Sequence, residues 1–339
     1  MNTSRRNAAR KKRIHMTVLI STIIAVTVLG SGYYLWRETR STSMKSSGGR
    51  VQTAADNDEI IEYQGNSYKY NDHLSNYLFM GIDTREDVDT YQSQEDAGQA
   101  DSLFLVSMDR VTEKLKVLFI PRDTITEIEV FNPGGKSLGK TKDHINIQYA
   151  YGDGRQKSCE LEKTAVSGLL DDLPIQGYCS VNMDAIPVLT DYVGGVEITV
   201  PDGSLEDVNP DFKQGAQITI TGENAEQFVR YRDINKNQSA LTRQKRQKTY
   251  LQALMQKAQQ KASSDSGFVV GLYDSIKSYT VTSMGNDIFA KLLAASANDT
   301  VETETVPGEG TQGKNFDEYH VDQEKLHEMI LSMFYERQE

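Results

Sequence analysis

The sequence predicts an α/β protein in which helices are layered on both faces of a central mixed sheet, with one transmembrane helix near the N-terminus. Short apolar segments alternate with amphipathic ones through most of the 339 residues, as is typical of layered α/β folds. An apolar fraction of 38% and a charged fraction of 25% argue against general disorder. An uncharged stretch that directly follows a basic cluster predicts the membrane helix.

The N-terminus predicts a single-pass membrane protein. Residues 1–15 contain six Lys or Arg and no acid, and residues 16–36 carry no charged side chain. A helix of about 20 apolar residues spans a bilayer, so residues 16–36 are long enough to be an anchor. Two tyrosines and a tryptophan mark its far end, and basic residues stay cytoplasmic, so the domain that follows is predicted to be extracellular. A cleaved signal peptide is the alternative, because Gly30-Ser31-Gly32 offers small residues near a cut.

The charge of the chain excludes one class of partner. The formal net charge is −11, and beyond the first thirteen residues the chain carries 31 basic against 48 acidic residues. Nucleic acid is therefore not an expected partner, since phosphate backbones require a basic face. The basic N-terminal segment is explained by topology and by anionic membrane lipid. The two cysteines, Cys159 and Cys179, are compatible with a disulfide or with two free buried thiols.

The segment after the anchor predicts a tether. Residues 37–70 are rich in Ser, Thr, Gly, Asn and Asp and show no sustained apolar period, which is typical of a linker. We expect residues 71–335 to form the extracytoplasmic domain.

Three apolar segments begin this domain and predict neighbouring strands. They are Asn76–Ile82, Ser102–Met108 and Leu115–Ile120. The connection Asp109–Lys114 is short enough for an antiparallel hairpin. A hairpin places the start of the second strand and the end of the third at the same edge of the sheet. If the first strand is also antiparallel to the second, its end reaches that edge too.

The rest of the domain alternates helices and strands. Helices are predicted at residues 160–170, 185–193, 222–231 and 239–262 and from about 322 onward, and strands at residues 178–183 and 196–200. Asp184, Thr221 and Ser239 are the predicted N-caps of three of these helices.

Charged residues flank the predicted strand ends. Asp83 follows the first strand, Asp101 precedes the second, and Arg122-Asp123 follows the third. Magnesium commonly binds to one or two carboxylates together with substrate phosphates, and arginine matches phosphate oxygens with a planar fork. Each residue taken alone is more often a turn residue or half of a structural ion pair. Their shared edge favours a metal–diphosphate site.

A second basic group follows the predicted helix 222–231. It comprises Arg230, Arg232, Arg243, Gln244 and Arg246. By itself such a group is typical of a solvated helix end whose charges complement the helix dipole.

Several short motifs occur in a fixed order along the chain. They are GIDTR (81–85), ADSLFLVSMD (100–109), LFIPRDT (118–124), HINIQYAYG (144–152), YVGGVEITVP (192–201), FVRYRD (228–233) and RQ (243–244). This ordered set, behind a membrane anchor, resembles the LytR-CpsA-Psr family over roughly residues 71–260, with a weaker similarity up to the last helix.

The resemblance implies a function. Members of that family transfer undecaprenyl-diphosphate-linked anionic glycopolymers, such as teichoic acid or capsule, to peptidoglycan at the cell membrane of mostly Gram-positive bacteria. It implies a Mg²⁺ (or Mn²⁺) cofactor bound by Asp83 and Asp101, which with Arg122 would be the catalytic residues. The implied substrate-binding set is Arg85, Gln99, Arg122, Asp123, Arg230, Arg232 and Gln244. The implied partners are a polyprenyl-diphosphate-linked glycan, peptidoglycan and membrane lipid, with the lipid tail in an apolar tunnel.

The chain departs from the family pattern at two places. Gln99 stands where members usually have an arginine that contacts the diphosphate, and Lys236–Ala240 replaces a Gly-Asp-x-Gly-Arg string. An uncharged Gln99 still donates hydrogen bonds but predicts a lower affinity for the diphosphate.

Three other functions are compatible with these motifs. The domain is alternatively a lipid-diphosphate hydrolase with water as the acceptor, or a non-catalytic scaffold that binds the lipid carrier. A direct transcriptional regulator is disfavoured, because about fifteen cytoplasmic residues are too few to fold into a DNA-binding domain. The general base is open between Asp83 and Asp123, although a metal ligand is a poor free base.

Overall fold

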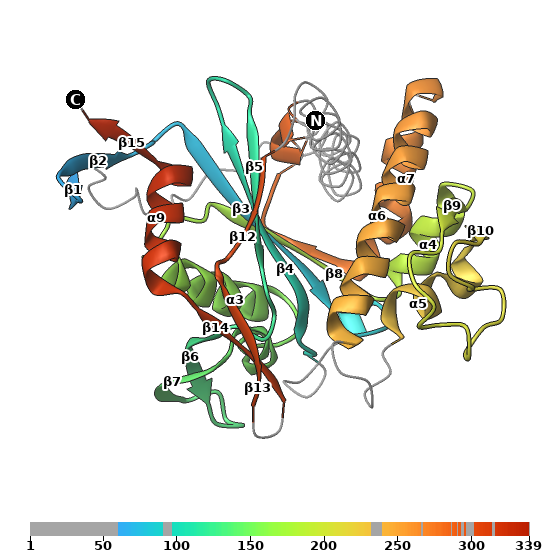
Figure 1. Cartoon of the computed structure of the whole chain (residues 1–339), viewed down its shortest axis with the longest axis horizontal. Coiled ribbons are helices and arrows are strands. Elements are labelled where there is room, and N and C mark those ends of the chain that lie inside the picture. Colours follow the sequence, from blue (N-terminus) through green and yellow to red (C-terminus); the bar gives the residue numbers. More distant parts are fainter. Residues whose placement is uncertain are drawn as a thin grey trace, which may run out of the picture. The chain divides into compact units, whose positions relative to one another are not determined.

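The computed structural model is shown in Figure 1. It describes residues 60–90, 97–231, 239–265, 267–285, 287–289, 291–292, 295, 302–313 and 316–338. The predicted basic segment 1–15, the anchor 16–36 and most of the tether lie outside these residues. Within the described part, none of the helices is both long enough and apolar enough to span a bilayer.

The described chain divides into two compact units. Residues 60–181, 281–284 and 302–338 form the first, here called the sheet unit. Residues 182–280 and the described part of 285–295 form the second, here called the helical unit.

A six-stranded sheet is the centre of the sheet unit. Its strand order is β11-β8-β3-β4-β5-β12. The strands are β3 (Leu74–Ile82), β4 (Ala100–Asp109), β5 (Leu115–Ile120), β8 (Gly177–Asn182), β11 (Thr280–Thr282) and β12 (Glu302–Thr305). β3, β4 and β5 pair antiparallel, whereas β12 pairs parallel with β5. The predicted central mixed sheet is confirmed.

The predicted meeting of three strand ends is also confirmed. Ile82 at the end of β3 pairs with Ala100 at the start of β4, after a register shift at Gly81. Leu103 of β4 pairs with Ile120 at the end of β5. The end of β3, the start of β4 and the end of β5 therefore form one edge, which we call the rim.

One face of this sheet covers the main hydrophobic core. Alternate residues of β3 and β4, such as Leu78 and Leu105, pack in one cluster with Val166 of α3 (Gln156–Leu169) and Ile330 of α9 (Gln323–Phe334). Both helices lie along the sheet in Figure 1. The short 3-10 helices η3 (Ile145–Ile147) and η4 (Tyr149–Tyr151) contribute to the same core. This packing fixes the segments that follow β5 near the rim.

The opposite face of the sheet carries an aromatic row. The rings of Phe79 and Phe104 stack with centroids 5.3 Å apart and planes 5° apart, and Phe119 lies 6.0 Å from Phe104. Gly81 and Ser102 pair with each other. Because side chains alternate along a strand, both lie on the same face as the aromatic row, between the row and the rim.

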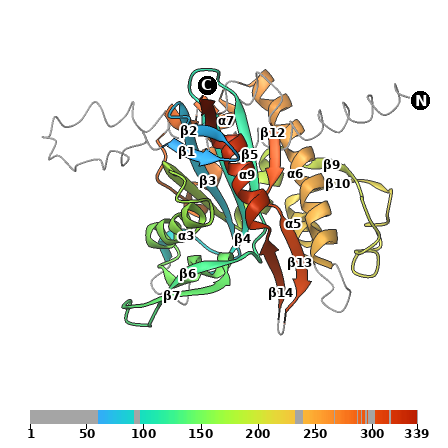
Figure 2. The ribbon, with the colours of Figure 1, turned by 60° about the vertical axis from the view of Figure 1, so that its left-hand side comes forward.

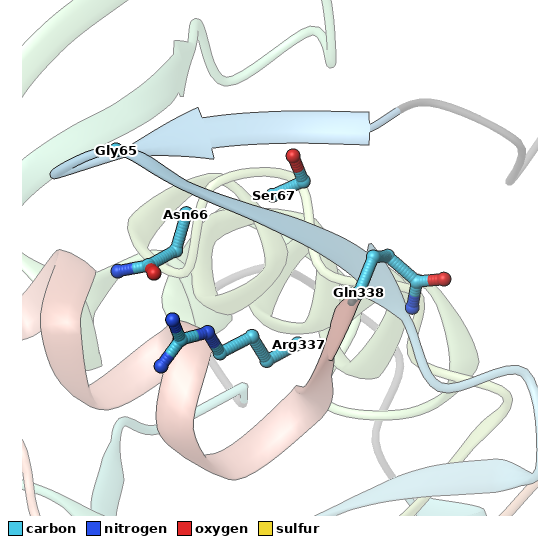
Figure 3. Close-up of a pocket in the computed structure, with 5 residues that line it drawn as sticks. All are labelled: Gly65, Asn66, Ser67, Arg337 and Gln338. Atoms are coloured by element: carbon cyan, nitrogen blue, oxygen red, sulfur yellow. The ribbon is translucent and has the colours of Figure 1, made fainter.

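A small second sheet begins earlier than expected. β1 (Ile60–Tyr63), β2 (Asn66–Tyr70) and β15 (Tyr335–Gln338) form a three-stranded sheet. Residues 60–70 thus form strands within the segment that we expected to be the tether, because β15 supplies a partner from the far end of the chain. Beside this sheet is a cavity of about 550 Å³ lined by Gly65, Asn66, Ser67, Arg337 and Gln338. Figure 3 shows its lining side chains. The cavity lies beyond the start of β3, away from the rim.

Two hairpins that the sequence pattern did not predict follow the rim. They are β6 (Ile125–Phe131) with β7 (Ser137–His144), and β13 (Gly308–Gln312) with β14 (Asp317–Val321). A parallel bridge between Thr124 and Tyr319 joins them, and Figures 1 and 2 both show them at the rim end of the sheet.

The helical unit contains most of the predicted helices. It comprises α4 (Ala185–Tyr192), α5 (Gly222–Arg230), α6 (Ser239–Ser264), α7 (Phe268–Ile276) and the hairpin β9 (Val196–Thr199) with β10 (Gln217–Ile220). Thr221 caps α5 as predicted, because its amide donates to Asn224 Oδ1 at 2.9 Å in a capping box. The prediction that Asp184 caps α4 was wrong, since its side chain makes no cap hydrogen bond and its backbone is already helical.

Both cysteines are free and buried. Cys159 Sγ lies 3.4 Å from Ser180 Oγ. Since successive side chains of a strand point to opposite faces, Cys179 points away from Cys159. Burial raises the pKa of Cys159 to about 12, so its thiol is inert at neutral pH.

Candidate functional site

The rim brings together four of the predicted site residues. Asp83 directly follows β3, Asp101 is the second residue of β4, and Arg122 and Asp123 follow β5. They meet because β3, β4 and β5 are consecutive antiparallel strands. The side chains of Arg122, Asp101 and Asp123 are 22%, 19% and 25% exposed, so the cluster is partly buried and still accessible.

Arg122 is held by two carboxylates. Its Nη1 donates to Asp101 Oδ1, and its Nε lies 3.3 Å from Asp123 Oδ1. Burial opposes the charge of the guanidinium, but these two acids raise the pKa of Arg122 above its ordinary value. Arg122 is thus a fixed, permanently charged group at the accessible edge of the sheet. This geometry suits the binding of phosphate oxygens.

Asp83 is fixed by the loop that leads into β4. Its Oδ1 accepts a 2.6 Å hydrogen bond from the Gln99 amide, and its own amide donates to Gln99 O at 3.1 Å. Gly98 has φ +68°, and a Cβ there would lie 2.2 Å from Thr84 Cγ2 and 2.8 Å from Asp83 Oδ1. Burial raises the pKa of Asp83, and the charge of Asp101 adds to this while the Gln99 amide opposes it. A glycine is therefore required beside the Asp83 carboxylate.

A buried asparagine that we did not predict links two sides of the rim. Asn146 is 5% exposed. Its Nδ2 donates to Gln99 Oε1 at 3.1 Å, and its amide donates to Arg122 O at 3.4 Å. Asn146 lies within the string HINIQYAYG, which we quoted only as a motif. Gln99 is exposed, and the hydrogen bond from Asn146 fixes the orientation of its side chain.

Asp83 and Asp101 could bind a divalent cation if substrate oxygens supplied further ligands. In the described part of the chain, no three Asp, Glu, His or Cys residues are grouped as metal ligands. Asp83 and Asp101 are hard oxygen donors, and the pKa of Asp83 is raised mainly by burial and further by the like charge of Asp101. Two carboxylates completed by phosphate oxygens and water are a common set for magnesium. The residues present fit that ion when a substrate phosphate completes the set.

The other predicted ligands are distributed differently. Arg85 is exposed on the loop after Asp83. Arg230 ends α5 in the helical unit, and its Nη1 lies 2.6 Å from Glu226 Oε1. Gln244 belongs to α6 in the same unit, and Arg232 lies outside the described residues. The predicted diphosphate set is therefore divided between the two units, and the contacts described above join Arg122 with Asp101 and Asp123 and join Asp83 with Gln99.

Arg246 has a structural role that the sequence did not reveal. It is 1% exposed. Its Nε donates to Phe228 O at 2.9 Å, and its other nitrogens donate to Tyr231 O and Ser204 Oγ, with Asp202 Oδ1 at 3.6 Å. These carbonyls belong to the C-terminal end of α5, where helical carbonyls have no partner within the helix.

A second side chain of α6, that of Gln247, also contacts this end of α5. Its Nε2 donates to Val229 O at 3.2 Å. Helical spacing could have revealed that Arg246 is buried. It lies four residues before Tyr250 and eight before Leu254, so all three share one face of α6, and all three are buried. Arg246 and Gln247 thus fix the segment that carries Arg230.

Comparison with known proteins gives a consistent result. Residues 34–334 match the model of the LytR_cpsA_psr family. A relative from Halalkalibacterium halodurans, named polyisoprenyl-teichoic acid–peptidoglycan teichoic acid transferase TagU, is 28% identical over 322 residues, which cover 93% of this chain and 95% of the relative. The protein of the same name from Bacillus subtilis is 30% identical over 256 residues, covering 74% and 73%. The crystal structure of B. subtilis TagV has the same fold, with a TM-score of 0.56 at 24% identity over 77% of this chain and 97% of that one.

Proposed function

The chain belongs to the LytR-CpsA-Psr family, and we propose that it transfers an anionic glycopolymer from a polyprenyl diphosphate carrier onto peptidoglycan. The observation that carries this proposal is the rim, where Arg122 and two carboxylates converge at one accessible edge. The names of the TagU relatives support a teichoic acid as the polymer. A capsule-like polymer has the same linkage chemistry and is the other candidate.

The proposed reaction is a phosphoryl transfer. The hydroxyl oxygen of a peptidoglycan sugar attacks the phosphorus atom on the glycan side of the diphosphate. A new P–O bond joins acceptor and glycan in a phosphodiester, and the P–O bond to the lipid-side phosphate breaks. The hydroxyl proton passes to a base, and polyprenyl phosphate leaves with the electron pair. We assign the base to Asp123, because Asp83 and Asp101 are the proposed metal ligands and a metal ligand is a poor free base.

The rim residues stabilise the negative charge of the diphosphate in two ways. Arg122 neutralises the phosphate oxygens, and its position is fixed by Asp101 and Asp123. A Mg²⁺ or Mn²⁺ ion held by Asp83 and Asp101 would supply further positive charge to the diphosphate. Charge stabilisation of this kind typically contributes on the order of a hundredfold or more to the rate.

The remaining predicted ligands complete the proposed substrate set. The family resemblance adds Arg230, Arg232 and Gln244 to this set. Gln99 supplies an uncharged amide whose orientation Asn146 fixes, and Arg85 orients neighbouring groups from the same loop as Asp83.

The location of the protein is part of the same proposal. Residues 16–36 anchor it in the cell membrane, residues 1–15 are cytoplasmic, and the domain faces outward. We propose that the polyprenyl chain lies in an apolar tunnel of the domain.

The test compares full-length wild type with Arg122→Ala in detergent micelles. We expect a short polyprenyl diphosphate to bind wild type more tightly with magnesium than after chelation. We also expect Arg122→Ala to lower the transfer rate to peptidoglycan by on the order of a hundredfold or more. Arg337→Ala is the matched control, since Arg337 is exposed beyond the other end of β3.

Three outcomes would change the proposal. Transfer by Arg122→Ala at the wild-type rate would remove Arg122 from the mechanism. Binding of the lipid without any reaction in wild type would indicate a scaffold, which the uncharged Gln99 favours. Release of the glycan phosphate to water alone would indicate a hydrolase.

A further inference from the structure

Two hairpins form a projection directly attached to the rim. We call it the hairpin lobe; its described residues are 125–144, 308–313 and 316–321. Tyr319 N donates to Asp123 O at 2.8 Å, and Ile145 N donates to Thr124 O at 2.8 Å. Figures 1 and 2 both show the lobe at the rim end of the sheet. The base of the lobe is therefore close to Arg122 and Asp123.

Phe316 is the most exposed large apolar side chain in the described residues. It is 71% exposed. Its ring lies edge-on to His144, with centroids 6.3 Å apart and planes at 89°. An isolated exposed apolar residue needs no explanation by itself, so the neighbour of Phe316 decides what the ring is suited to do.

His144 gives the Phe316 ring a rigid support. The Nδ1 atom of His144 lies 3.0 Å from Asp143 Oδ1, and its Nε2 lies 2.9 Å from Asp317 O. The side chain of His144 is 15% exposed. Both ring nitrogens are thus occupied, and the imidazole is fixed between the two hairpins. Phe316 presents an exposed ring against this fixed support.

The charge of the lobe selects the kind of ligand. The sequences 125–144 and 308–321 contain four lysines against six acids. A weakly acidic surface does not attract an anionic membrane or a polyanionic glycopolymer. An uncharged sugar ring is suited to Phe316, since the electron-rich face of an aromatic ring attracts the slightly positive C–H groups of a sugar.

We propose that Phe316, supported by His144, is the platform on which a sugar of the acceptor glycan lies while its hydroxyl group reaches the rim. This inference rests on the proposed function. Two residues beyond His144, Asn146 contacts Gln99 at the rim, so the chain path from platform to rim is short. The lobe thereby holds the uncharged acceptor, and Arg122 with the rim acids holds the charged donor.

The test is a kinetic comparison of full-length wild type, Phe316→Ala and Phe316→Trp. Transfer is measured against the concentration of soluble peptidoglycan glycan strands, and then against that of the polyprenyl-linked donor. Phe316→Ala is expected to raise the KM for the acceptor about tenfold, to leave the KM for the donor unchanged, and to retain kcat. Phe316→Trp is expected to restore the acceptor KM, because it keeps a large ring.

Val111→Ala is the matched control. Val111 is 67% exposed in the turn between β4 and β5, at the end of these strands away from the rim. It is expected to leave both KM values unchanged. An unchanged acceptor KM in Phe316→Ala would overturn the proposal. A raised donor KM instead would show that the ring contacts the membrane-embedded donor.

Direct binding separates this proposal from the proposed function. Binding of radiolabelled glycan strands to the full-length protein requires no catalysis. Weaker binding by Phe316→Ala than by wild type is expected even if wild type transfers nothing, in which case only the proposed function fails. Equal binding by both proteins would overturn the platform alone.

Discussion

At the rim of the sheet unit Arg122 contacts two carboxylates, whereas in the helical unit Arg246 is buried among carbonyl and hydroxyl oxygens and one carboxylate, that of Asp202. Arg122 is 22% exposed and Arg246 1%. The sequence placed Arg122 within a motif, and it placed Arg246 in a basic group that is typical of a solvated helix end. The donors of Arg246 are used inside its unit, which makes it a structural residue. Arg122 keeps an accessible side toward which an anion can bind.

The largest expected effect is on the Arg246 side of this comparison. Arg246→Ala would leave the carbonyls of Phe228 and Tyr231 and the carboxylate of Asp202 without their buried cation. We expect a loss of about 3 to 5 kcal/mol in the free energy of unfolding, measured by urea denaturation of the full-length protein. Arg246→Lys is expected to recover part of this loss, because lysine keeps the charge but not the planar fork.

Arg337→Ala again provides the control for stability. Arg337 is exposed, and its replacement is expected to change stability by less than about 0.5 kcal/mol. If Arg246→Ala proved as stable as Arg337→Ala, Arg246 would not be structural, and a role in ligand binding would have to be considered.

A smaller effect is expected on the Arg122 side, through Gly98. An alanine at Gly98 would adopt a φ of +68° and would clash with Thr84 and with the Asp83 carboxylate. We expect a cost of about 1 to 3 kcal/mol in stability together with weaker magnesium-dependent binding of polyprenyl diphosphate. Gly65→Ala is the matched control, because Gly65 also has a positive φ (+75°) but its Cβ would meet no atom within 4 Å.

The two variants separate strain from the effect on Asp83. Gly65→Ala is expected to lose stability through backbone strain while it retains lipid binding. Equal lipid binding by Gly98→Ala and Gly65→Ala would mean that the position of Asp83 does not matter for the donor.

The sequence predicted the sheet side of the fold better than the two hairpins. β3, β4 and β5 are continuous apolar segments bounded by polar turns, and β5 was predicted with its observed limits, Leu115–Ile120. β7 (Ser137–His144) reads SLGKTKDH and is exposed over most of its length, so it has no apolar alternation to detect. β15 was also missed, because its partner β2 lies more than 260 residues away in the sequence.

The site residues, too, could be predicted only where their position follows from local sequence. Asp83, Asp101, Arg122 and Asp123 were predicted to share an edge, because their places at strand ends are a local property. Asn146 was missed, since its link to Gln99 depends on how η3 packs under the rim. Sequence patterns report residue type and spacing, whereas burial depends on tertiary packing.

Glu162 is a buried ionisable group that can be compared with Arg122 and Arg246, whose charges have hydrogen-bond or ion-pair partners. Glu162 of α3 is 0% exposed, and its carboxylate oxygens make no close hydrogen bond among the described residues, although the backbone amide of Tyr149 lies near enough to favour the charged form. Burial raises the pKa of Glu162 well above its ordinary value. The folded protein therefore keeps this proton at pH values where the unfolded chain has lost it. The stabilising contribution is complete below the unfolded pKa, about 4.3, and is lost as pH rises toward the folded pKa.

Glu162→Gln removes this titration and has the smallest expected effect at low pH. The stability of wild type relative to the variant should fall as pH rises, by at most about 1.4 kcal/mol per pH unit, so the variant becomes relatively more stable toward neutral pH. Urea unfolding from pH 4.5 to 8 measures the difference. Glu160→Gln is the control, because Glu160 lies on the same helix but is exposed and paired with Lys163. Identical pH profiles for wild type and Glu162→Gln would show that Glu162 has a partner after all, and that burial alone does not distinguish it from the well-partnered Arg246.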